Sequence, residues 1–187
     1  MEIIKKIMKN ILILGAARSG KSTLANMLSD ELGHNIISVD AFIGAFQENY
    51  PELGMSYHTG NNHMVAPFVA SYANAVIYNH PKSKFVVEGY HIKLADAVKL
   101  FGDKFEIVVL GYPKLSPKDV LNNVRKYEGK FDYTRAMSDD ELLSVVSRHV
   151  EYSKKFEEEC KNLGLQFYDT SYNRNDVLSH IINKIRG

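Results

Sequence analysis

Residues 15–22 read Gly-Ala-Ala-Arg-Ser-Gly-Lys-Ser, and they match the phosphate-binding pattern G-x-x-x-x-G-K-[ST] at every constrained position. A short apolar run of strand formers, residues 11–14, precedes this stretch, and a segment with apolar residues at helical spacing follows it. The pattern indicates phosphate binding when it lies between a strand and a helix, as it does here. We therefore predict a nucleotide phosphate site, and the alternative is a glycine-rich turn that contains Lys-Ser by chance.

The residues of this phosphate loop have separate chemical roles. Gly15 and Gly20 let the backbone direct N–H groups at phosphate oxygens, partly through positive φ values. The helix that follows offers free N–H groups and a favourable dipole to an anion. Lys21 is predicted to bind the β- and γ-phosphates, and Ser22 to ligate Mg²⁺. The nucleotide-binding residues predicted from the loop are Gly15, Ala16, Ala17, Arg18, Ser19, Gly20, Lys21, Ser22 and Thr23.

Length and composition favour one globular domain over residues 1–187. The chain is 45% hydrophobic and 24% charged, and its net charge is +1, which gives no basic excess for nucleic acid. No apolar stretch is long enough to span a membrane, and the first apolar run is too short for a signal peptide. The single cysteine, Cys160, cannot form an internal disulfide. Together with the nucleotide motif, this predicts a cytoplasmic protein.

Five short apolar runs alternate with helical patterns, which predicts parallel βαβ units and an α/β sandwich. Apolar residues at three- and four-residue spacing predict helices near 65–77 and 94–101. The segment Ser138-Asp139-Asp140-Glu141 is a capping box that opens a helix to about residue 163, and a last helix is expected near 176–185. The predicted strands are 11–14, 36–39, 85–88, 106–110 and 165–168.

Two polar segments, at about 44–64 and about 126–137, interrupt this alternation of strands and helices. Such segments are often solvated surface, but in a phosphate-loop protein they are also where a substrate pocket and a closing lid would lie. We predict that the first lines the acceptor pocket and that the second is a lid. Phe42 and Phe46 are expected to form apolar walls of that pocket, and the hydrogen-bonding candidates are Tyr57, His58, Asn61 and His63.

Carboxylates stand at the ends of two predicted strands, where parallel sheets bind their ligands. Asp40 follows the second strand, and Glu88 ends the third. Phosphoryl transfer needs a metal to neutralise the phosphates and a group that deprotonates the attacking hydroxyl. Asp40 is predicted to take that proton, and Ser22, Asp40 and Glu88 are predicted to lie at the metal. The alternative for both carboxylates is helix capping or loop solvation.

With these residues the chain resembles the small P-loop kinases, which include nucleoside kinases, uridine-kinase-like enzymes and chloramphenicol-type phosphotransferases. The resemblance rests on the strand–loop–helix opening, on Val39-Asp40-Ala41-Phe42 and on Val87-Glu88-Gly89. The Asp-x-Phe segment is similar to the hydroxyl-activating aspartate of the last two groups. The resemblance implies the P-loop NTPase fold, a three-layer α/β/α sandwich with a five-stranded parallel sheet in the order 2-3-1-4-5.

The resemblance also implies further site residues. Tyr168-Asp169-Thr170-Ser171 is similar to the loop that borders adenine in such kinases, so Thr170 joins the predicted nucleotide-binding set. Arg125 stands where these kinases carry an arginine near the adenine or the phosphates, and it is expected to be catalytic with Lys21 and Asp40. His91 is the histidine expected in the acceptor pocket. Candidate lid cations, for which solvated surface is an equal alternative, are Lys130, Arg135 and Arg148.

These observations predict a kinase that uses ATP and Mg²⁺ to phosphorylate a hydroxyl of a small molecule, such as a nucleoside or a sugar. The sparse lid arginines, and the lack of an Asp-Arg-Ser segment at the third strand, disfavour a nucleotide or deoxynucleoside acceptor. The alternatives are a regulatory NTPase, disfavoured by the lack of an N-K-x-D signature, and a nucleotide-binding protein without chemistry. The expected partner is the small-molecule acceptor, with no nucleic acid or membrane, and the protein is expected to be a monomer or homodimer.

Overall fold

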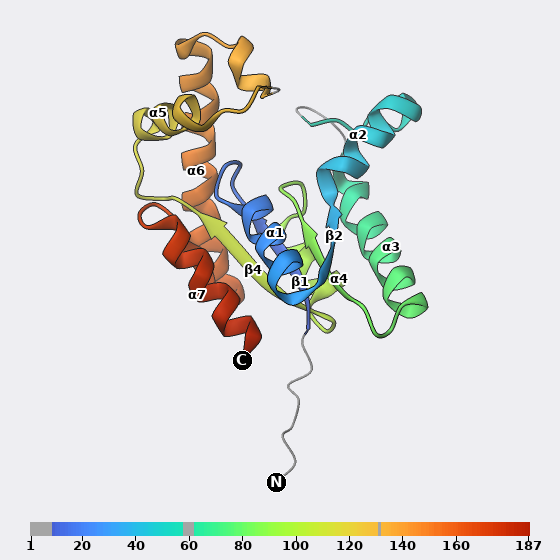
Figure 1. Cartoon of the computed structure of the whole chain (residues 1–187). Helices are drawn as coiled ribbons and strands as arrows, with labels where there is room; N and C mark the ends of the chain where they lie inside the picture. Colours follow the sequence, from blue (N-terminus) through green and yellow to red (C-terminus); the bar gives the residue numbers. More distant parts are fainter. Residues whose placement is uncertain (1–8, 58–61, 131) are drawn as a thin grey trace.

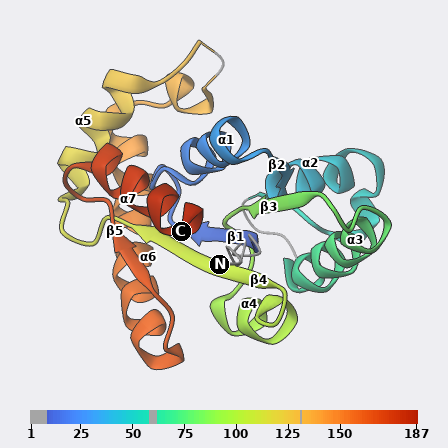
Figure 2. The same ribbon diagram turned by 60° about the horizontal axis from the view of Figure 1, so that its bottom comes forward.

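The computed structural model describes residues 9–57, 62–130 and 132–187. Its centre is a five-stranded sheet in the order β2-β3-β1-β4-β5, and every pairing is parallel (Figure 1, with all five strands labelled in Figure 2). This confirms the predicted strand number, order and direction. The strands are β1 (Asn10–Gly15), β2 (His34–Ser38), β3 (Lys84–Glu88), β4 (Phe105–Gly111) and β5 (Phe167–Asp169).

Helices cover both faces of the sheet, as predicted for an α/β/α sandwich (Figure 2). The reason is visible in β1, where Ile11 and Ile13 pack with α1 and α7, while Leu12 and Leu14 pack with α3 and α4 on the other face. The helices are α1 (Lys21–Leu32), α2 (Val39–Asn49), α3 (Val65–Asn79), α4 (Leu94–Phe101), α5 (Pro117–Tyr127), α6 (Asp139–Leu163) and α7 (Arg174–Arg186). Short 3₁₀ turns form at Pro51–Leu53, Asn62–Met64 and Tyr133–Ala136.

The long helix α6 follows its sequence signals closely. The side chain of Ser138 accepts a hydrogen bond from the Glu141 N–H and Glu141 bonds back to Ser138, which confirms the predicted capping box. Gly164 ends the helix in the left-handed region at φ 66°. Leu165 still donates its N–H to the Cys160 carbonyl of α6. The last strand therefore begins at Phe167, and the predicted strand 165–168 was two residues early.

Helix α2 corrects two predictions. Val39, expected to end the second strand, is the first residue of α2, and residues 44–49 of the expected polar insertion belong to the same helix. Its buried residues, Val39 and Ile43, lie four residues apart on one face. Phe42 and Phe46 also pack against this core, so the apolar residues of α2 have the i, i+3, i+4, i+7 spacing of an amphipathic helix. The helical signal was present in the sequence but was not recognised.

Helix α5 was also not predicted. Its surface is mostly polar, and its apolar stripe consists of buried Val120 and Val124 with partly buried Leu121. The local signal was present, because Ser116 and Asp119 form a reciprocal capping box and Pro117 stands at the first helical position. Within the described ranges, no helix combines the length and the apolar character that crossing a bilayer requires.

Candidate active site

The phosphate loop joins β1 to α1 and is shaped by its backbone. Gly15 has φ 141° and Gly20 has φ 103°, which confirms the expected positive values at both glycines. Ala16 donates its N–H to the Leu110 carbonyl of β4, and Ser19 donates to the Ala16 carbonyl. The loop therefore lies tightly against β4, and α1 starts directly behind it at Lys21.

Lys21 is buried, and its Nζ donates to the Ala16 carbonyl oxygen at 2.8 Å. Burial lowers the pKa of Lys21, whereas the charges of Glu88 and Asp40 raise it. The two predicted carboxylates thus lie near enough to act on the loop lysine. The lysine is held inside the loop, where the phosphates of a nucleotide would displace the carbonyl as its partner.

The Ser22 hydroxyl donates to Oε2 of Glu88 at 3.1 Å, which joins the start of α1 to the end of β3. An alcohol oxygen beside a carboxylate oxygen is a donor set that suits Mg²⁺, because this ion prefers oxygen ligands and retains several waters. The described residues contain no group of three or more His, Cys, Asp or Glu that could hold a metal. Ser22 and Glu88 would therefore hold Mg²⁺ together with phosphate oxygens, rather than within a closed protein site.

Asp40 lies in the first turn of α2, and its side chain is 53% exposed. His91 Nε2 lies 4.0 Å from Asp40 Oδ1. The Asn62 amide donates to the Ser56 carbonyl, which identifies its nitrogen, and that nitrogen lies 3.2 Å from His91 Nδ1. Nδ1 of neutral His91 is then the acceptor and Nε2 carries the hydrogen. The ring therefore presents its N–H to the Asp40 carboxylate.

These groups line one end of an open cleft of about 1960 Å³. Of the predicted nucleotide, metal and base residues, the cleft wall contains Ala17, Arg18, Gly20, Lys21, Ser22, Thr23, Asp40, Glu88 and Thr170. Gly15, Ala16 and Ser19 lie behind the loop surface and do not line the cleft. Thr170 borders the cleft, but its hydroxyl is already bonded to the Ser19 and Gly111 carbonyls at 3.1 and 3.0 Å. Thr170 therefore ties the phosphate loop to β4.

The acceptor end of the cleft differs from the expected one. Phe42 and Phe46 pack edge-on against Phe68, at ring distances of 5.3 and 4.8 Å, and do not line the cleft. His63 is also absent from the cleft wall, while His58 and Asn61 lie outside the described residues. Of the expected residues, Tyr57 and His91 do line the cleft, and Asn62, Tyr90 and Tyr152 join them there.

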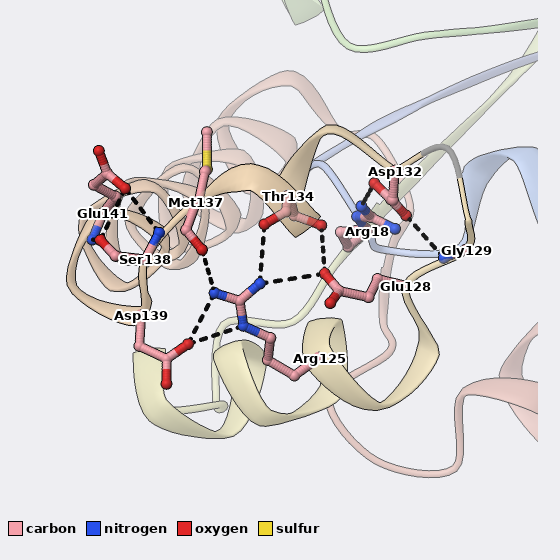
Figure 3. Close-up of polar contacts among 10 residues, drawn as sticks. All are labelled: Arg18, Arg125, Glu128, Gly129, Asp132, Thr134, Met137, Ser138, Asp139 and Glu141. Atoms are coloured by element: carbon pink, nitrogen blue, oxygen red, sulfur yellow. Dashed lines mark hydrogen bonds and ion pairs between the residues drawn. The ribbon is translucent and has the colours of Figure 1, made fainter.

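Arg125 holds together the segment at about 126–137, which is predicted to be a lid and is called the lid below (Figure 3). Its guanidinium donates to the Thr134 and Met137 carbonyls at 2.9 and 2.7 Å, and to Asp139 at 2.9 Å. It does not line the cleft, so in this structure it supports the lid and does not face the nucleotide site. Among the other candidate lid cations, Arg148 lines the cleft, whereas Lys130 and Arg135 do not.

Helix α6 contributes a cleft-facing stripe that the sequence analysis mostly missed. Residues at positions 145, 148, 149 and 152 line the cleft at three- and four-residue spacing. Within the described residues, Nδ1 of His149 is buried without a hydrogen-bond partner. Burial is the main cause that lowers the pKa of His149 to about 4, and the nearby cations Lys21, Arg148 and Arg18 add to it. The helical spacing of Arg148, His149 and Tyr152 was the sequence signal that could have identified this stripe.

Tyr112, which follows β4, is a further residue that the sequence analysis missed. Its hydroxyl donates to the Ala17 carbonyl at 2.6 Å, and the ring is almost fully buried. Burial raises the pKa of the Tyr112 phenol, so it remains a neutral hydrogen-bond donor. Tyr112 therefore supports the phosphate loop through this hydrogen bond.

No protein-family model and no curated protein sequence matches the chain. Solved structures do resemble it over nearly its whole length. A shikimate kinase from Bacteroides thetaiotaomicron has a TM-score of 0.64 and 14% identity, with 96% of this chain and 99% of that chain covered. A gluconokinase from Sinorhizobium meliloti 1021 has a TM-score of 0.60 and 14% identity, with coverages of 95% and 91%. An unliganded sugar kinase from Janibacter sp. HTCC2649 has a TM-score of 0.60 and 15% identity, with coverages of 94% and 93%. At such identities the likeness shows the fold, which is the P-loop fold of these proteins.

Proposed function

We propose that this protein is a kinase that transfers the γ-phosphoryl group of ATP to a hydroxyl of a small molecule in the presence of Mg²⁺. The observation that carries the proposal is the convergence of Lys21, the Ser22–Glu88 pair and Asp40 at one end of the cleft. The fold neighbours support the proposal in general terms, because they are described as kinases of small molecules.

The phosphate end of the cleft would bind the donor. The backbone of the loop and the N-terminus of α1 favour an anion, and Lys21 adds a positive charge. Ser22 and Glu88 would hold Mg²⁺, which neutralises phosphate charge when it is bound. Thr170 and the start of α7 border the cleft beyond the loop, on the side where the nucleoside part of the donor would lie.

The acceptor would bind next to the phosphates, beside Asp40 and His91. Asp40 is the exposed carboxylate there, so it would accept the proton of the attacking hydroxyl. The N–H of His91 faces Asp40, and Asn62 fixes the His91 ring from the other side. Phenol, amide and imidazole groups, with aromatic faces between them, suit an uncharged ring that carries several hydroxyls. Both a sugar and a nucleoside meet that description.

The test is ADP release with purified protein, ATP and Mg²⁺, measured with and without each of a panel of sugars, sugar acids, shikimate and nucleosides. We expect release to depend on one class of acceptor and to stop when EDTA removes the metal. With that acceptor, Asp40→Asn is expected to reduce kcat by about 100-fold or more, since a general base contributes on the order of 10²–10⁴-fold. The affinity for a non-hydrolysable ATP analogue should stay unchanged.

Two outcomes contradict the proposal. Steady ATP hydrolysis that no acceptor stimulates would favour a regulatory NTPase, and full turnover by Asp40→Asn would remove Asp40 from the role of base. His180→Gln is a suitable control, because His180 lies exposed on α7 and away from the cleft wall. This control should leave both kcat and nucleotide affinity unchanged.

A further inference from the structure

The phosphate loop contains an arginine whose side chain reaches the lid. Arg18 adopts φ 66°, a left-handed conformation that is uncommon for a residue with a Cβ. Its Nη2 donates to Oδ1 of Asp132, a residue 114 positions further along the chain (Figure 3). The two side chains are 34% and 17% exposed, so this ion pair is partly shielded from water. The pair joins the phosphate loop directly to the lid.

Asp132 is well suited to hold an arginine in place. The hydrogen bond from Arg18 lowers the pKa of Asp132, so the carboxylate is ionised at neutral pH. Its second oxygen, Oδ2, accepts from the Gly129 N–H at 3.4 Å, and its backbone carbonyl accepts from the Arg135 N–H at 3.1 Å. One oxygen is thereby anchored to the lid backbone, while the other faces Arg18.

Arg125 fixes the lid behind Asp132. It bonds the carbonyls of Thr134 and Met137, and the Thr134 hydroxyl in turn donates to Glu128 at 2.9 Å. These contacts tie the 3₁₀ turn Tyr133–Ala136 to helix α5 (Figure 3). Arg125 therefore anchors the turn that directly follows Asp132, and Asp132 in turn holds the Arg18 side chain.

Arg18 keeps most of its donors available for a ligand. A guanidinium has five N–H groups in a planar fork that matches phosphate oxygens, and Asp132 engages only Nη2. Within residues 9–57, 62–130 and 132–187, Arg18 makes no other hydrogen bond or ion pair. The side chain lines the cleft, and it lies near enough to Lys21 that both charges act on His149.

We propose that the Arg18 guanidinium binds the terminal phosphate of the donor nucleotide, and that Asp132 is the positioning residue that holds the guanidinium in the orientation for this contact. The proposal rests on the proposed kinase function for the identity of the donor. In this arrangement the phosphate loop supplies the arginine and the lid supplies the carboxylate that orients it. A cation would thus face the phosphates although the lid itself has few arginines.

The test compares the affinity for a non-hydrolysable ATP analogue with the affinity for ADP, by calorimetry in Mg²⁺ and without any acceptor. Arg18→Gln is expected to weaken analogue binding by about 10- to 100-fold, the range of one lost hydrogen bond to a charged group. ADP binding should change by less than about threefold, because ADP lacks the terminal phosphate. Arg18→Lys should fall between the wild type and Arg18→Gln, since it keeps the charge but not the fork.

Asp132→Asn tests the positioning role. It should weaken analogue binding by about 3- to 10-fold and should have no further effect in the Arg18→Gln background, because a residue that acts through Arg18 needs it present. Arg135→Gln is the matched lid control, with no expected change in either affinity. Circular dichroism of each variant checks that the fold is retained.

Three results would overturn the inference. They are an equal loss of analogue and ADP affinity in Arg18→Gln, an Asp132→Asn effect that persists without Arg18, and a wild-type protein that binds neither nucleotide. The proposed function fails differently. If the analogue-to-ADP preference depends on Arg18 as expected but no acceptor is phosphorylated, the inference about Arg18 stands and the kinase assignment does not.

Discussion

The phosphate loop and the lid face the same cleft but are built in opposite ways. The loop takes its shape from the backbone, with Gly15 and Gly20 at positive φ and an N–H from Ala16 bonded to β4. The lid takes its shape from a side chain, because Arg125 bonds two of its carbonyl groups. The stability of the loop should therefore be sensitive to an added side-chain atom, and the stability of the lid to the loss of the Arg125 side chain.

The largest effect on stability is expected from Gly15→Ala. A Cβ at this position would lie 1.9 Å from the Leu110 carbonyl oxygen, and the residue has φ 141°. Strain and overpacking together should lower the free energy of unfolding by about 3–5 kcal/mol, as measured by chemical denaturation.

Gly33→Ala is the matched control for this substitution. Gly33 also has a positive φ, 71°, but a Cβ added there would meet nothing within 4 Å. The control should lose only about 1–2 kcal/mol, the cost of a left-handed conformation. Equal losses in the two variants would show that the clash with the Leu110 carbonyl adds nothing to the cost of Gly15→Ala.

Lys21→Met should separate function from stability within the loop. Lys21 is buried, and burial lowers its pKa, so its charge opposes folding, whereas in the proposed function the same charge would bind phosphate. We expect affinity for ATP to fall by about 100-fold, comparable to the loss of a buried charged contact. The free energy of unfolding should stay within about 1 kcal/mol of the wild type or rise. A large drop in stability would mean that Lys21 is structural.

The difference between loop and lid also explains what the sequence could predict. The loop is eight contiguous residues whose conformation follows from their own sequence, so its backbone shape could be predicted directly, and the nucleotide-binding role of its residues stays a prediction. The five apolar runs gave the sheet, because strands covered on both faces are continuous hydrophobic stretches. Asp40 and Glu88 followed from the rule that ligands bind at the carboxyl ends of parallel strands.

The lid contacts were beyond prediction because they join distant residues. Nothing near Arg18 in the sequence indicates Asp132 as its partner, and nothing near Arg125 indicates that its guanidinium bonds backbone carbonyls. Phe42 and Phe46 were misplaced for a related reason. Their neighbour Phe68 comes from α3, and only the packing of α2 on α3 turns the two rings away from the cleft.

Arg125→Ala is expected to affect the lid and spare the loop. Removal of the guanidinium leaves the Thr134 and Met137 carbonyls without this partner, which should lower the free energy of unfolding by about 1–2 kcal/mol. Hydrogen exchange should accelerate about tenfold or more over residues 132–137 and remain unchanged over residues 15–22. Lys118→Ala, an exposed change on the same helix, is the control. Uniform acceleration in both regions would show that the lid and the loop open together.

The smallest expected effect is a pH dependence at His149, where the two regions meet. Burial, with the added charges of Lys21 and Arg148, lowers the pKa of His149 from 6.5 to about 4. The unfolded chain therefore binds a proton at this residue at higher pH than the folded protein does. The stability that neutral His149 contributes is present above about pH 6.5 and is lost as the pH falls toward 4.

His149→Gln should remove this part of the acid sensitivity. The measurement is the free energy of unfolding of the variant minus that of the wild type, followed by denaturation from pH 7.5 to pH 4.5. We expect this difference to shift in favour of the variant as the pH falls through about 6.5, whereas His180→Gln should show a flat difference. A bound phosphate would place negative charge among the cations that face His149, so saturating ATP should raise its pKa and flatten the wild-type curve. If ATP leaves the slope unchanged, the phosphates do not bind beside His149.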